Sequence, residues 1–268
     1  MNHDVDTTLG TLSVGVVGSG PAMVMWPSLL MGKTLWDAQV EHFRPRFTTV
    51  AIDPPGHGAS SPLTRDITFD ECATCIVEVL DALHLGQAHL LGSSWGAMVG
   101  GVFAARHPDR VGHSVLMCGT ASTATRRQRV EYGAMLRVGQ LLGGIKPPLT
   151  RSVVRSFLGP TSRQQRPDAV KTVLELAGRN DLASVGHAIR SVVPDRPDHH
   201  ELFATITTPV LIIAGREDAT FPLNELESMA KAIPHSEFVV LDDAAHLAAL
   251  EVPDTVNALI DSFLDRAE

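Results

Sequence analysis

Short apolar runs recur along the chain, and segments in which apolar and polar residues alternate with helical spacing separate them. An apolar or β-branched run of this length, bounded by Gly, Pro or Asp, is typical of a buried strand. The polar turn Gly18-Ser19-Gly20-Pro21 joins the first two of these runs and predicts a hairpin that leads into the first central strand. The predicted strands are residues 12–17, 22–26, 47–52, 88–91, 111–118, 209–215 and 237–241.

Segments with helical spacing follow most of these strands, at residues 34–43, 70–83, 97–105, 223–232 and 255–264. Thr68 precedes the second segment and is a plausible N-cap, because a threonine hydroxyl can accept a hydrogen bond from a free amide of the first turn. Repeated strand–helix units are typical of a mostly parallel sheet with helices on both faces. The sequence therefore predicts an α/β fold.

Residues 121–200 interrupt this alternation. They contain no strand-like run, and the predicted helices are residues 126–142, 151–157, 167–177 and 182–192. Because the segment follows Gly119-Thr120 at the end of a predicted strand, we expect a helical cap, 121–200, inserted into a core formed by 1–120 and 201–268. The alternative is a helical subdomain that only adds stability.

The motif Gly92-Ser93-Ser94-Trp95-Gly96 follows one predicted strand and precedes a predicted helix. A G-x-S-x-G sequence at a strand–turn–helix junction is typical of a nucleophile elbow, whose central residue here is Ser94. The turn is tight, and glycine avoids the collision that a side chain at Gly92 or Gly96 would cause. The alternative reading of the five residues is an ordinary Gly-Ser turn before a helix.

Two later strands deliver the partners that a nucleophilic serine needs. Residues 209–215 lead into Glu217 and Asp218, and residues 237–241 lead into a loop that contains His246. The chain order serine, acid, histidine is typical of hydrolytic triads that begin at a nucleophile elbow. Parallel sheets place their sites at the carboxyl ends of the strands. Asp242 and Asp243 are rival acids, but they precede His246 too closely to approach the far side of its ring.

These motifs resemble those of the α/β-hydrolases, and within them the 3-oxoadipate enol-lactonases and related small esterases. The resemblance spans nearly the whole chain except roughly 121–200. Besides the elbow it rests on the segments Pro27-Ser28-Leu29, Leu35-Trp36-Asp37-Ala38-Gln39, Asp53-Pro54-Pro55-Gly56-His57-Gly58-Ala59-Ser60, Val115-Leu116-Met117-Cys118-Gly119-Thr120 and Ala244-Ala245-His246-Leu247 with Glu251.

The resemblance implies roles for particular residues. It favours Asp218 over Glu217 as the acid, and it assigns His57 to a structural turn. It implies an oxyanion hole formed by the amides of Trp95 and of Ser28 or Leu29. The chain departs from many relatives in having Trp26-Pro27 where they have His-Gly, and Trp95 where they have Met or Leu.

The resulting hypothesis is a serine hydrolase that cleaves a small to medium carboxylic ester or lactone through an acyl-enzyme intermediate. Ser94 is the expected nucleophile, His246 the general base, and Asp218 the group that orients the imidazole. One alternative uses the same three residues for C–C bond hydrolysis or cofactor-free perhydrolysis. Another is a small-ligand receptor with this fold and little turnover.

Candidate pocket residues are Trp26, Tyr132 and Arg126. Enol-lactonase substrates carry a carboxylate, which Arg126 could bind through paired hydrogen bonds. A solvent-exposed helix face is the competing interpretation of the cluster that Arg126 forms with Arg127 and Arg129. The remainder of the predicted cap is rich in Leu, Val, Met and Gly. We therefore expect neutral substrates to be preferred.

Composition narrows the remaining possibilities. The net charge is −8 with only 22 Lys and Arg, which gives no electrostatic basis for nucleic-acid binding. No apolar stretch is long enough for a membrane span, and the polar start of the chain is unlike a signal peptide. His187, His199 and His200 lack the spacing of metal ligands, so neither a metal nor a cofactor is expected. The three cysteines, Cys72, Cys75 and Cys118, are expected to be structural thiols, and a reducing cytoplasm is the simplest location.

Overall fold

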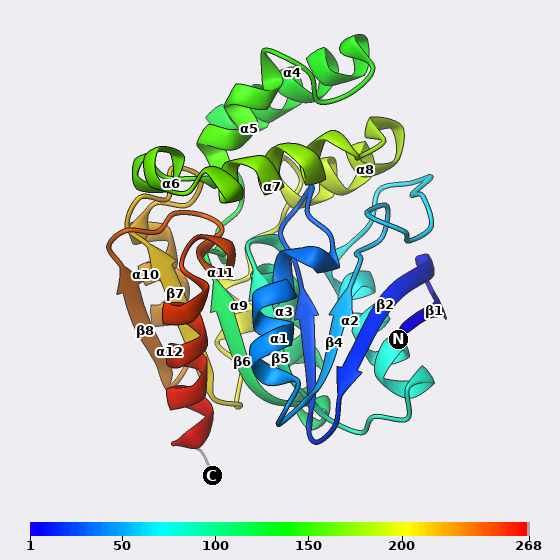
Figure 1. The fold of residues 1–268 in the computed structure, drawn as a ribbon, viewed down its shortest axis with the longest axis vertical. Helices are drawn as coiled ribbons and strands as arrows, with labels where there is room; N and C mark the ends of the chain where they lie inside the picture. The colour runs from blue at the N-terminus through cyan, green and yellow to red at the C-terminus, as the bar shows by residue number, and fades with distance from the viewer. Residues whose placement is uncertain (267–268) are drawn as a thin grey trace.

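A twisted sheet of eight strands runs through the centre of residues 1–266, the part of the chain that the computed structural model describes (Figure 1). The strand order across the sheet is β1-β2-β4-β3-β5-β6-β7-β8. The strands are β1 (Asn2–Thr7), β2 (Gly10–Gly18), β3 (Ala22–Trp26), β4 (Thr48–Ile52), β5 (Ala88–Ser93), β6 (Val111–Met117), β7 (Val210–Gly215) and β8 (Ser236–Leu241).

The sheet is mostly parallel, as predicted. The six strands from β4 to β8 in this order run parallel to their neighbours, whereas β1 and β2 form an antiparallel edge. Every residue of β3 and of β7 is buried. Strands with both faces covered consist of nearly continuous apolar residues, which is why short apolar runs located these strands in the sequence.

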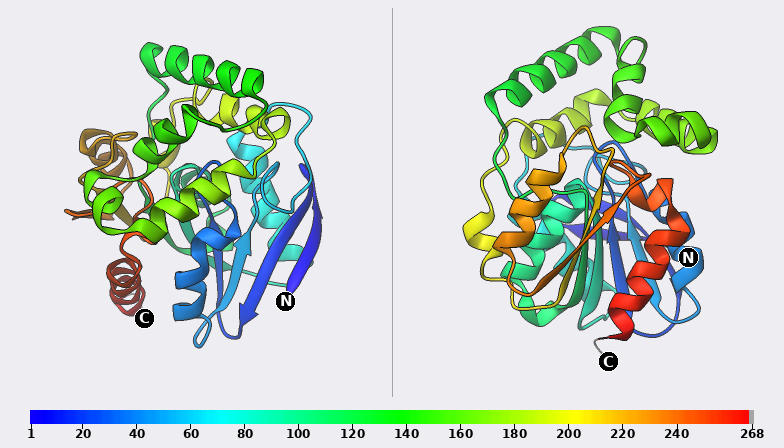
Figure 2. Two further views of the ribbon diagram at one scale, coloured as in Figure 1. Left: turned by 45° about the horizontal axis from the view of Figure 1, so that its top comes forward. Right: turned by 90° about the vertical axis from the view of Figure 1, so that its left-hand side faces the viewer.

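Helices cover both faces of the sheet (Figures 1 and 2). The helices α1 (Asp37–Phe43) and α12 (Pro253–Asp265) lie on one face, and the other face carries α2 (Phe69–Ala82), α3 (Trp95–Arg106), α9 (His200–Phe203) and α10 (Leu223–Ala232). Thr68 caps α2 as predicted, because its hydroxyl accepts the Glu71 amide in a capping box. Short helices also occur at η1 (Lys33–Trp36), η2 (Pro108–Arg110) and α11 (Ala248–Glu251).

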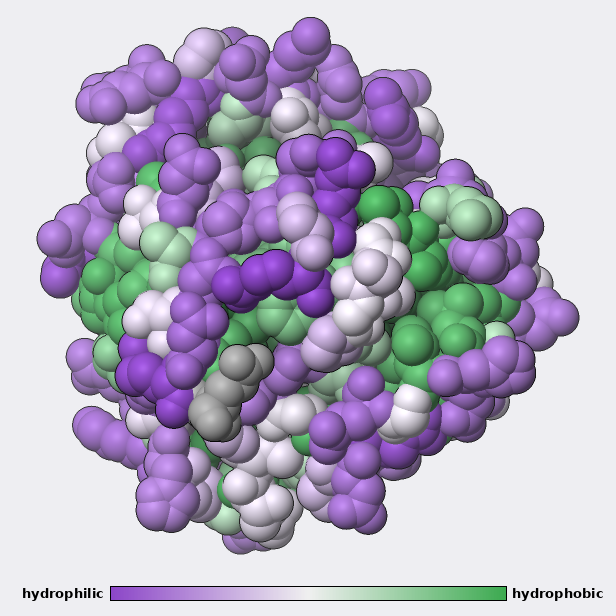
Figure 3. All heavy atoms as spheres, turned by 60° about the horizontal axis from the view of Figure 1, so that its bottom comes forward, coloured by the Kyte–Doolittle hydropathy of each residue, from purple (hydrophilic) through white to green (hydrophobic). Residues whose placement is uncertain are grey.

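The remaining helices lie above the carboxyl ends of the parallel strands (Figures 1 and 2). They are α4 (Arg126–Leu142), α5 (Leu149–Phe157), α6 (Pro160–Gln165), α7 (Pro167–Gly178) and α8 (Leu182–Val192). The bounds of α4 and α8 agree with the prediction, whereas α6 is too short and polar to be found from periodicity. The opposite end of the molecule carries mainly hydrophilic residues with hydrophobic patches between them (Figure 3).

For the first residues, one expectation is wrong and one strand is missing from the prediction. The predicted hairpin does not form, because β4 lies between β2 and β3, antiparallel to the former and parallel to the latter. The turn from Gly18 to Pro21 therefore connects strands that are not neighbours. The strand β1 was not predicted at all. It is an edge strand in which only Val5 is buried, so backbone pairing with β2 rather than an apolar pattern holds it in place.

Within residues 1–266, no helix combines the length and the apolar composition that a membrane crossing requires.

Candidate active site

Ser94 occupies a sharp turn between β5 and α3. Its backbone has φ 54° and ψ −106°, a conformation that costs energy for a residue with a side chain. Its amide donates to the Met117 carbonyl at 2.7 Å, which fixes the turn against β6. A Cβ atom on Gly92 would lie 2.2 Å from the carbonyl oxygen of Gly96, so the turn closes only because Gly92 has no side chain.

Gly96 is under a tighter constraint, and this predicts a stability effect. A Cβ atom there would lie 1.9 Å from the Trp26 carbonyl oxygen at the end of the central strand β3. Because backbone atoms cannot move aside cheaply, we expect Gly96→Ala to lower the free energy of unfolding by about 1–3 kcal/mol or more. Gly133→Ala is the matched control, since a Cβ there meets nothing within 4 Å. It lies inside α4 and should stabilise by up to about 1 kcal/mol. Urea unfolding of both variants measures the effects, and equal stability would contradict the proposed constraint.

A continuous chain of hydrogen bonds joins Ser94, His246 and Asp218. His246 Nε2 lies 2.7 Å from Ser94 Oγ, and His246 Nδ1 lies 2.8 Å from Asp218 Oδ2. Asp218 Oδ1 accepts the amides of Thr220 and Phe221 at 2.8 and 3.0 Å, which orients the carboxylate. The side chains of His246 and Asp218 are almost completely excluded from solvent. The structure thus brings together the three residues that the sequence singled out.

The rival acids have other partners. Glu217 accepts hydrogen bonds from the amide and the hydroxyl of Thr161 in α6. Asp242 is exposed and pairs with Arg216, and Asp243 pairs with Arg166. Of the four candidate carboxylates, Asp218 is the one that hydrogen-bonds His246.

The predicted oxyanion donors lie in the loop that follows β3, which contains Ser28 and Leu29, and at the start of α3, which is Trp95. No hydrogen bond joins the amides of Ser28, Leu29 or Trp95 to another residue within 1–266, so these donors are free to bind a ligand. The next residue, Leu30, has φ 65°, and both its amide and its carbonyl are hydrogen-bonded. Its amide donates to His57 Nε2 at 3.1 Å, and its carbonyl accepts Asn180 Nδ2 at 2.9 Å.

His57 is therefore part of the support for this loop. Its Nδ1 donates to the Pro55 carbonyl, which leaves Nε2 as the acceptor. Burial lowers the pKa of His57 to about 4, so the ring is neutral and can accept the Leu30 amide at physiological pH. The interaction agrees with the structural role that the sequence suggested for His57.

A cavity of about 110 Å³ opens above Ser94 and His246, enclosed by residues of α4, α5 and α8 and of the loops that carry the site. Apart from His246, its lining contains no Asp, Glu, Lys, Arg or His. Leu29 and Tyr132 contribute to the wall. The lining residues are Leu29, Leu30, Ser94, Met98, Tyr132, Met135, Leu136, Gly139, Ile145, Leu149, Ser152, Val153, Ser156, Phe157, Leu182, Ile189, Val192, Val193, Thr220, Phe221 and His246.

Tyr132 supplies a hydroxyl to an otherwise mostly apolar wall. Thr220 lines the same cavity, and its hydroxyl donates to the Ser156 carbonyl at 2.8 Å. Burial raises the pKa of Tyr132, so the phenol stays protonated at neutral pH. Hydroxyl groups of Ser152 and Ser156 also line the cavity. The polar groups available to a ligand are therefore uncharged.

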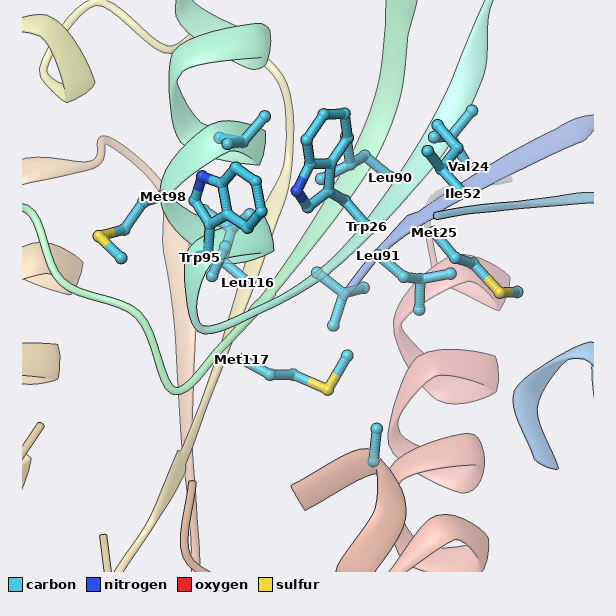
Figure 4. Close-up of a cluster of buried hydrophobic side chains, with 14 of the residues drawn as sticks. Val24, Met25, Trp26, Ile52, Leu90, Leu91, Trp95, Met98, Leu116 and Met117 are labelled. Atoms are coloured by element: carbon cyan, nitrogen blue, oxygen red, sulfur yellow. The ribbon is translucent and has the colours of Figure 1, made fainter. Parts of the chain in front are cut away.

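Two of the predicted pocket residues do not line the cavity. Trp26 is fully buried in the core, where its ring meets the Trp95 ring edge to face at 5.5 Å (Figure 4). Arg126 is exposed at the first turn of α4. A helix turns about 100° per residue, so Arg126 and Tyr132, six positions apart, point in different directions. The prediction that Trp26 and Arg126 line the pocket is therefore not met by this cavity.

Sequence reasoning did not find the residues that pack on His246. The Phe157 ring stacks on the imidazole at 5.7 Å, and the Phe221 ring lies 5.4 Å from it. Phe157 ends α5, and Phe221 follows the acid loop, so only the fold brings them together. The sequence predicts a helix over residues 151–157, but it does not show what Phe157 covers.

A second Ser–His–Asp arrangement lies far along the sequence from Ser94. His200 Nε2 is 2.8 Å from Ser228 Oγ, and His200 Nδ1 is 2.8 Å from Asp198 Oδ1. Ser228 lies inside α10, whereas Ser94 lies at a helix start with free amides nearby. Asp198 and His200 are partly exposed, and none of the three lines the cavity described above. This surface cluster, Ser228–His200–Asp198, is therefore separate from the cavity above Ser94, and its serine does not stand at a helix start.

His187 and His199 have different partners and, among the described residues, lie apart from any metal-binding cluster. His187 pairs with Asp66, and the ring of His199 packs between Phe69 and Phe203. In the described part of the chain, no three or more His, Cys, Asp or Glu side chains gather in a way that could hold a metal ion.

Comparisons with known proteins agree with this architecture. The family model for the alpha/beta hydrolase fold matches residues 21–253. The chain is 26% identical to 3-oxoadipate enol-lactonase 2 of Acinetobacter baylyi, over 92% of this chain and 89% of the relative. It is 24% identical to (E)-2-((N-methylformamido)methylene)succinate hydrolase of the same organism, over 92% of each chain.

A solved structure of an esterase from Thermogutta terrifontis superposes with a TM-score of 0.90. The alignment covers 100% of this chain and 99% of that chain at 24% identity, a level that supports the fold alone. The family model, by contrast, spans most of the sequence, including the elbow and both later loops. The chain therefore belongs to the α/β-hydrolase fold family and is a hydrolase.

Proposed function

We propose that this hydrolase is a serine esterase or lactonase that cleaves small, uncharged carboxylic esters or lactones through an acyl-enzyme. The observation that carries the proposal is the hydrogen-bonded chain from Ser94 through His246 to Asp218, which opens on an apolar cavity. A nucleophile, a base and an orienting acid in this arrangement are the requirements for nucleophilic catalysis by a serine.

The first half of the reaction forms the acyl-enzyme. Ser94 Oγ attacks the ester carbonyl while His246 Nε2 takes its proton, and Asp218 stabilises the resulting imidazolium. The tetrahedral oxyanion receives hydrogen bonds from the Trp95 amide and from the amide of Ser28 or Leu29. Collapse breaks the ester bond, the leaving oxygen takes the proton from His246 and departs as the alcohol, and Ser94 remains acylated.

The second half regenerates the enzyme. A water molecule transfers a proton to His246 and attacks the acyl carbonyl, again forming an oxyanion in the same hole. Collapse breaks the bond to Ser94 Oγ, which recovers its proton from His246, and releases the carboxylic acid. For a lactone the leaving alcohol stays attached to the acyl group, so the product is a single hydroxy acid.

The cavity lining supports uncharged substrates. A carboxylate in this cavity would lose its hydration without meeting a cationic side chain, because no Arg or Lys lines the wall. The names of two relatives denote derivatives of adipate and succinate, which are dicarboxylic acids. We therefore propose that this chain differs from them in substrate charge. A cavity of about 110 Å³ suits a small acyl or alkyl group.

A substrate screen distinguishes the remaining functions. Short p-nitrophenyl esters and small lactones test hydrolysis, while a vinylogous diketone and a perhydrolysis assay test the other reactions that the same three residues can support. Rapid turnover of esters or lactones is the expected result. Ligand binding without turnover of any compound would replace the proposal with a receptor function.

The charge preference gives a separate prediction. For a neutral lactone and its carboxylate-bearing analogue, we expect kcat/KM to favour the neutral compound by about 100-fold or more, because burying an unpaired carboxylate costs several kcal/mol. Arg126→Ala should leave both values unchanged, since Arg126 is exposed and outside the cavity. Steady-state kinetics of wild type and variant measure this. A preference for the acid that disappears in Arg126→Ala would restore an enol-lactonase-like specificity.

A further inference from the structure

A buried carboxylate holds the main chain on both sides of His246. Glu251, at the end of α11, is only 3% exposed. One of its oxygens, Oε1, accepts the amide of Ala245 at 2.9 Å and that of Leu247 at 3.1 Å. These two residues flank His246, so a single oxygen atom fixes the backbone immediately before and after the imidazole-bearing residue.

The other oxygen of Glu251 reaches the segment above the sheet. Oε2 accepts the hydroxyl of Ser162 in α6 at 2.6 Å, and Ser162 is itself completely buried. Ser162 Oγ in turn accepts Arg166 Nη1 at 2.8 Å. The Ser162 hydroxyl can make both contacts at once, because it accepts from Arg166 through a lone pair and donates its proton to Glu251.

Arg166 closes this network back onto the loop of His246. Its Nη1 also donates to the Asp243 carbonyl, and its Nη2 donates to the Asp243 carboxylate, both at 2.8 Å. The loop from β8 to α11 is therefore held at Asp243 by Arg166 and at Ala245 and Leu247 by Glu251. Cys118 Sγ adds a contact to the Ala245 carbonyl at 3.2 Å.

The hydrogen-bond partners of Glu251 are consistent with an ionised carboxylate. Burial raises the pKa of Glu251, while the donors Ser162, Ala245 and Leu247 oppose that rise. A buried carboxylate is tolerated where donors surround it, and Ser162, Ala245 and Leu247 all donate to Glu251. The loop residues from Asp242 to His246 belong to no helix or strand, so the contacts of Glu251 and Arg166, with one backbone hydrogen bond from the Glu217 amide to the Ala244 carbonyl at 3.0 Å, supply the order that regular structure does not.

We propose that Glu251 is a positioning residue, which fixes the loop of His246 through one carboxylate oxygen and fastens α6 to that loop through the other. The inference rests on the proposed role of His246 as the base. Proton transfer from Ser94 requires His246 Nε2 to stay within hydrogen-bonding distance, now 2.7 Å, and a misplacement of about 1 Å can cost about 100-fold in rate.

Two variants of Glu251 and one of Ser162 separate the contacts with the loop of His246 from the contact with α6. Glu251→Met retains the length but removes every acceptor, and we expect kcat to fall by about 100-fold while KM for a small neutral ester stays near the wild-type value. Glu251→Gln retains an oxygen that can accept both flanking amides, so it should recover most of the lost kcat. Ser162→Ala removes the hydrogen bond from α6 to Glu251, together with the one that Ser162 accepts from Arg166, but keeps both amide contacts of Glu251, and it should leave kcat close to wild type.

The rate of covalent labelling of Ser94 by an alkyl fluorophosphonate provides a second readout, because labelling requires the base but not deacylation. It should follow kcat through the series, while thermal unfolding shows whether each variant is folded. Should Glu251→Met not fold, Glu251→Asp carries the test, since the shorter side chain cannot reach both amides and Ser162 together. Its kcat should then fall below that of Glu251→Gln.

Three results would overturn the inference. They are wild-type kcat in folded Glu251→Met, a loss in Ser162→Ala as large as that in Glu251→Met, and a kcat for Glu251→Asp above that of Glu251→Gln. Failure of the proposed function gives a different outcome. Full activity of Ser94→Ala would reject the serine mechanism whatever the Glu251 variants do, whereas an essential Ser94 with normal turnover in Glu251→Met rejects only the positioning role.

Discussion

Ser94→Ala is expected to lower kcat for ester hydrolysis by about 10⁶-fold, because the three residues of a hydrolytic triad act as a unit and removal of the nucleophile removes the acyl-enzyme route. The loss should not come from unfolding. Alanine omits only the Oγ atom, whose partner is His246 Nε2, and the turn itself is held by Gly92, Gly96 and the Ser94 amide. Steady-state kinetics and circular dichroism measure the two properties independently.

Ser228→Ala is the matched control for this variant. The hydroxyl of Ser228 contacts His200 as that of Ser94 contacts His246, and His200 contacts Asp198 in turn. The surface cluster lies outside the cavity above Ser94, so we expect Ser228→Ala to keep wild-type kcat and fluorophosphonate to label Ser94 alone. Near-normal hydrolysis by Ser94→Ala would refute the serine mechanism. If that residual activity disappeared on adding Ser228→Ala, the surface cluster would be the active site.

The parts of this molecule that could be read from the sequence are those whose signal is local. The elbow is one, because the collision of a Cβ at Gly92 with the Gly96 carbonyl arises within five residues. The buried parallel strands are another, since burial on both faces requires an unbroken apolar run. The order of Ser94, Asp218 and His246 along the chain could be read in the same way, through the strands that precede them.

The features that were missed or misplaced depend on pairing between distant segments. A turn of the kind found from Gly18 to Pro21 often closes a hairpin, but the sequence does not show that β4 will enter between its arms. The pocket is a similar case. Arg126 and Tyr132 lie on one helix, and only its packing against α8 decides that Tyr132 faces the cavity while Arg126 faces solvent.

The supports of the candidate site belong to the same category. Asn180, between α7 and α8, and Ser162 in α6 belong to the helical segment above the sheet, yet each hydrogen-bonds a residue of the core, Leu30 and Glu251 respectively. Thr161 does the same for Glu217, the neighbour of Asp218. The loops that carry the oxyanion donors, the acid and the base are thus each tied to the helical segment. Such contacts join residues more than 50 positions apart and leave no periodic signal in the sequence.

Asp218→Asn is expected to lower kcat by about 10⁴-fold while leaving the protein folded. The amide oxygen can still accept the amides of Thr220 and Phe221, so the loop keeps its shape. The amide nitrogen, however, would replace the oxygen that faces His246 Nδ1 and would donate a hydrogen bond to it. The ring would then carry its proton on Nε2, and Nε2 could no longer accept the proton of Ser94.

Asp242→Asn is the matched control, because Asp242 also precedes His246 and is also an aspartate, but it is exposed and paired with Arg216. We expect its kcat and its rate of fluorophosphonate labelling to equal those of wild type, while Asp218→Asn loses both. The labelling rate is informative because it reports on activation of Ser94 by His246 without a contribution from deacylation. A reversal of the two variants would assign the acid to Asp242. Equal activity in both would show that His246 reaches its reactive tautomer without a carboxylate partner, and the role proposed for Asp218 would be lost.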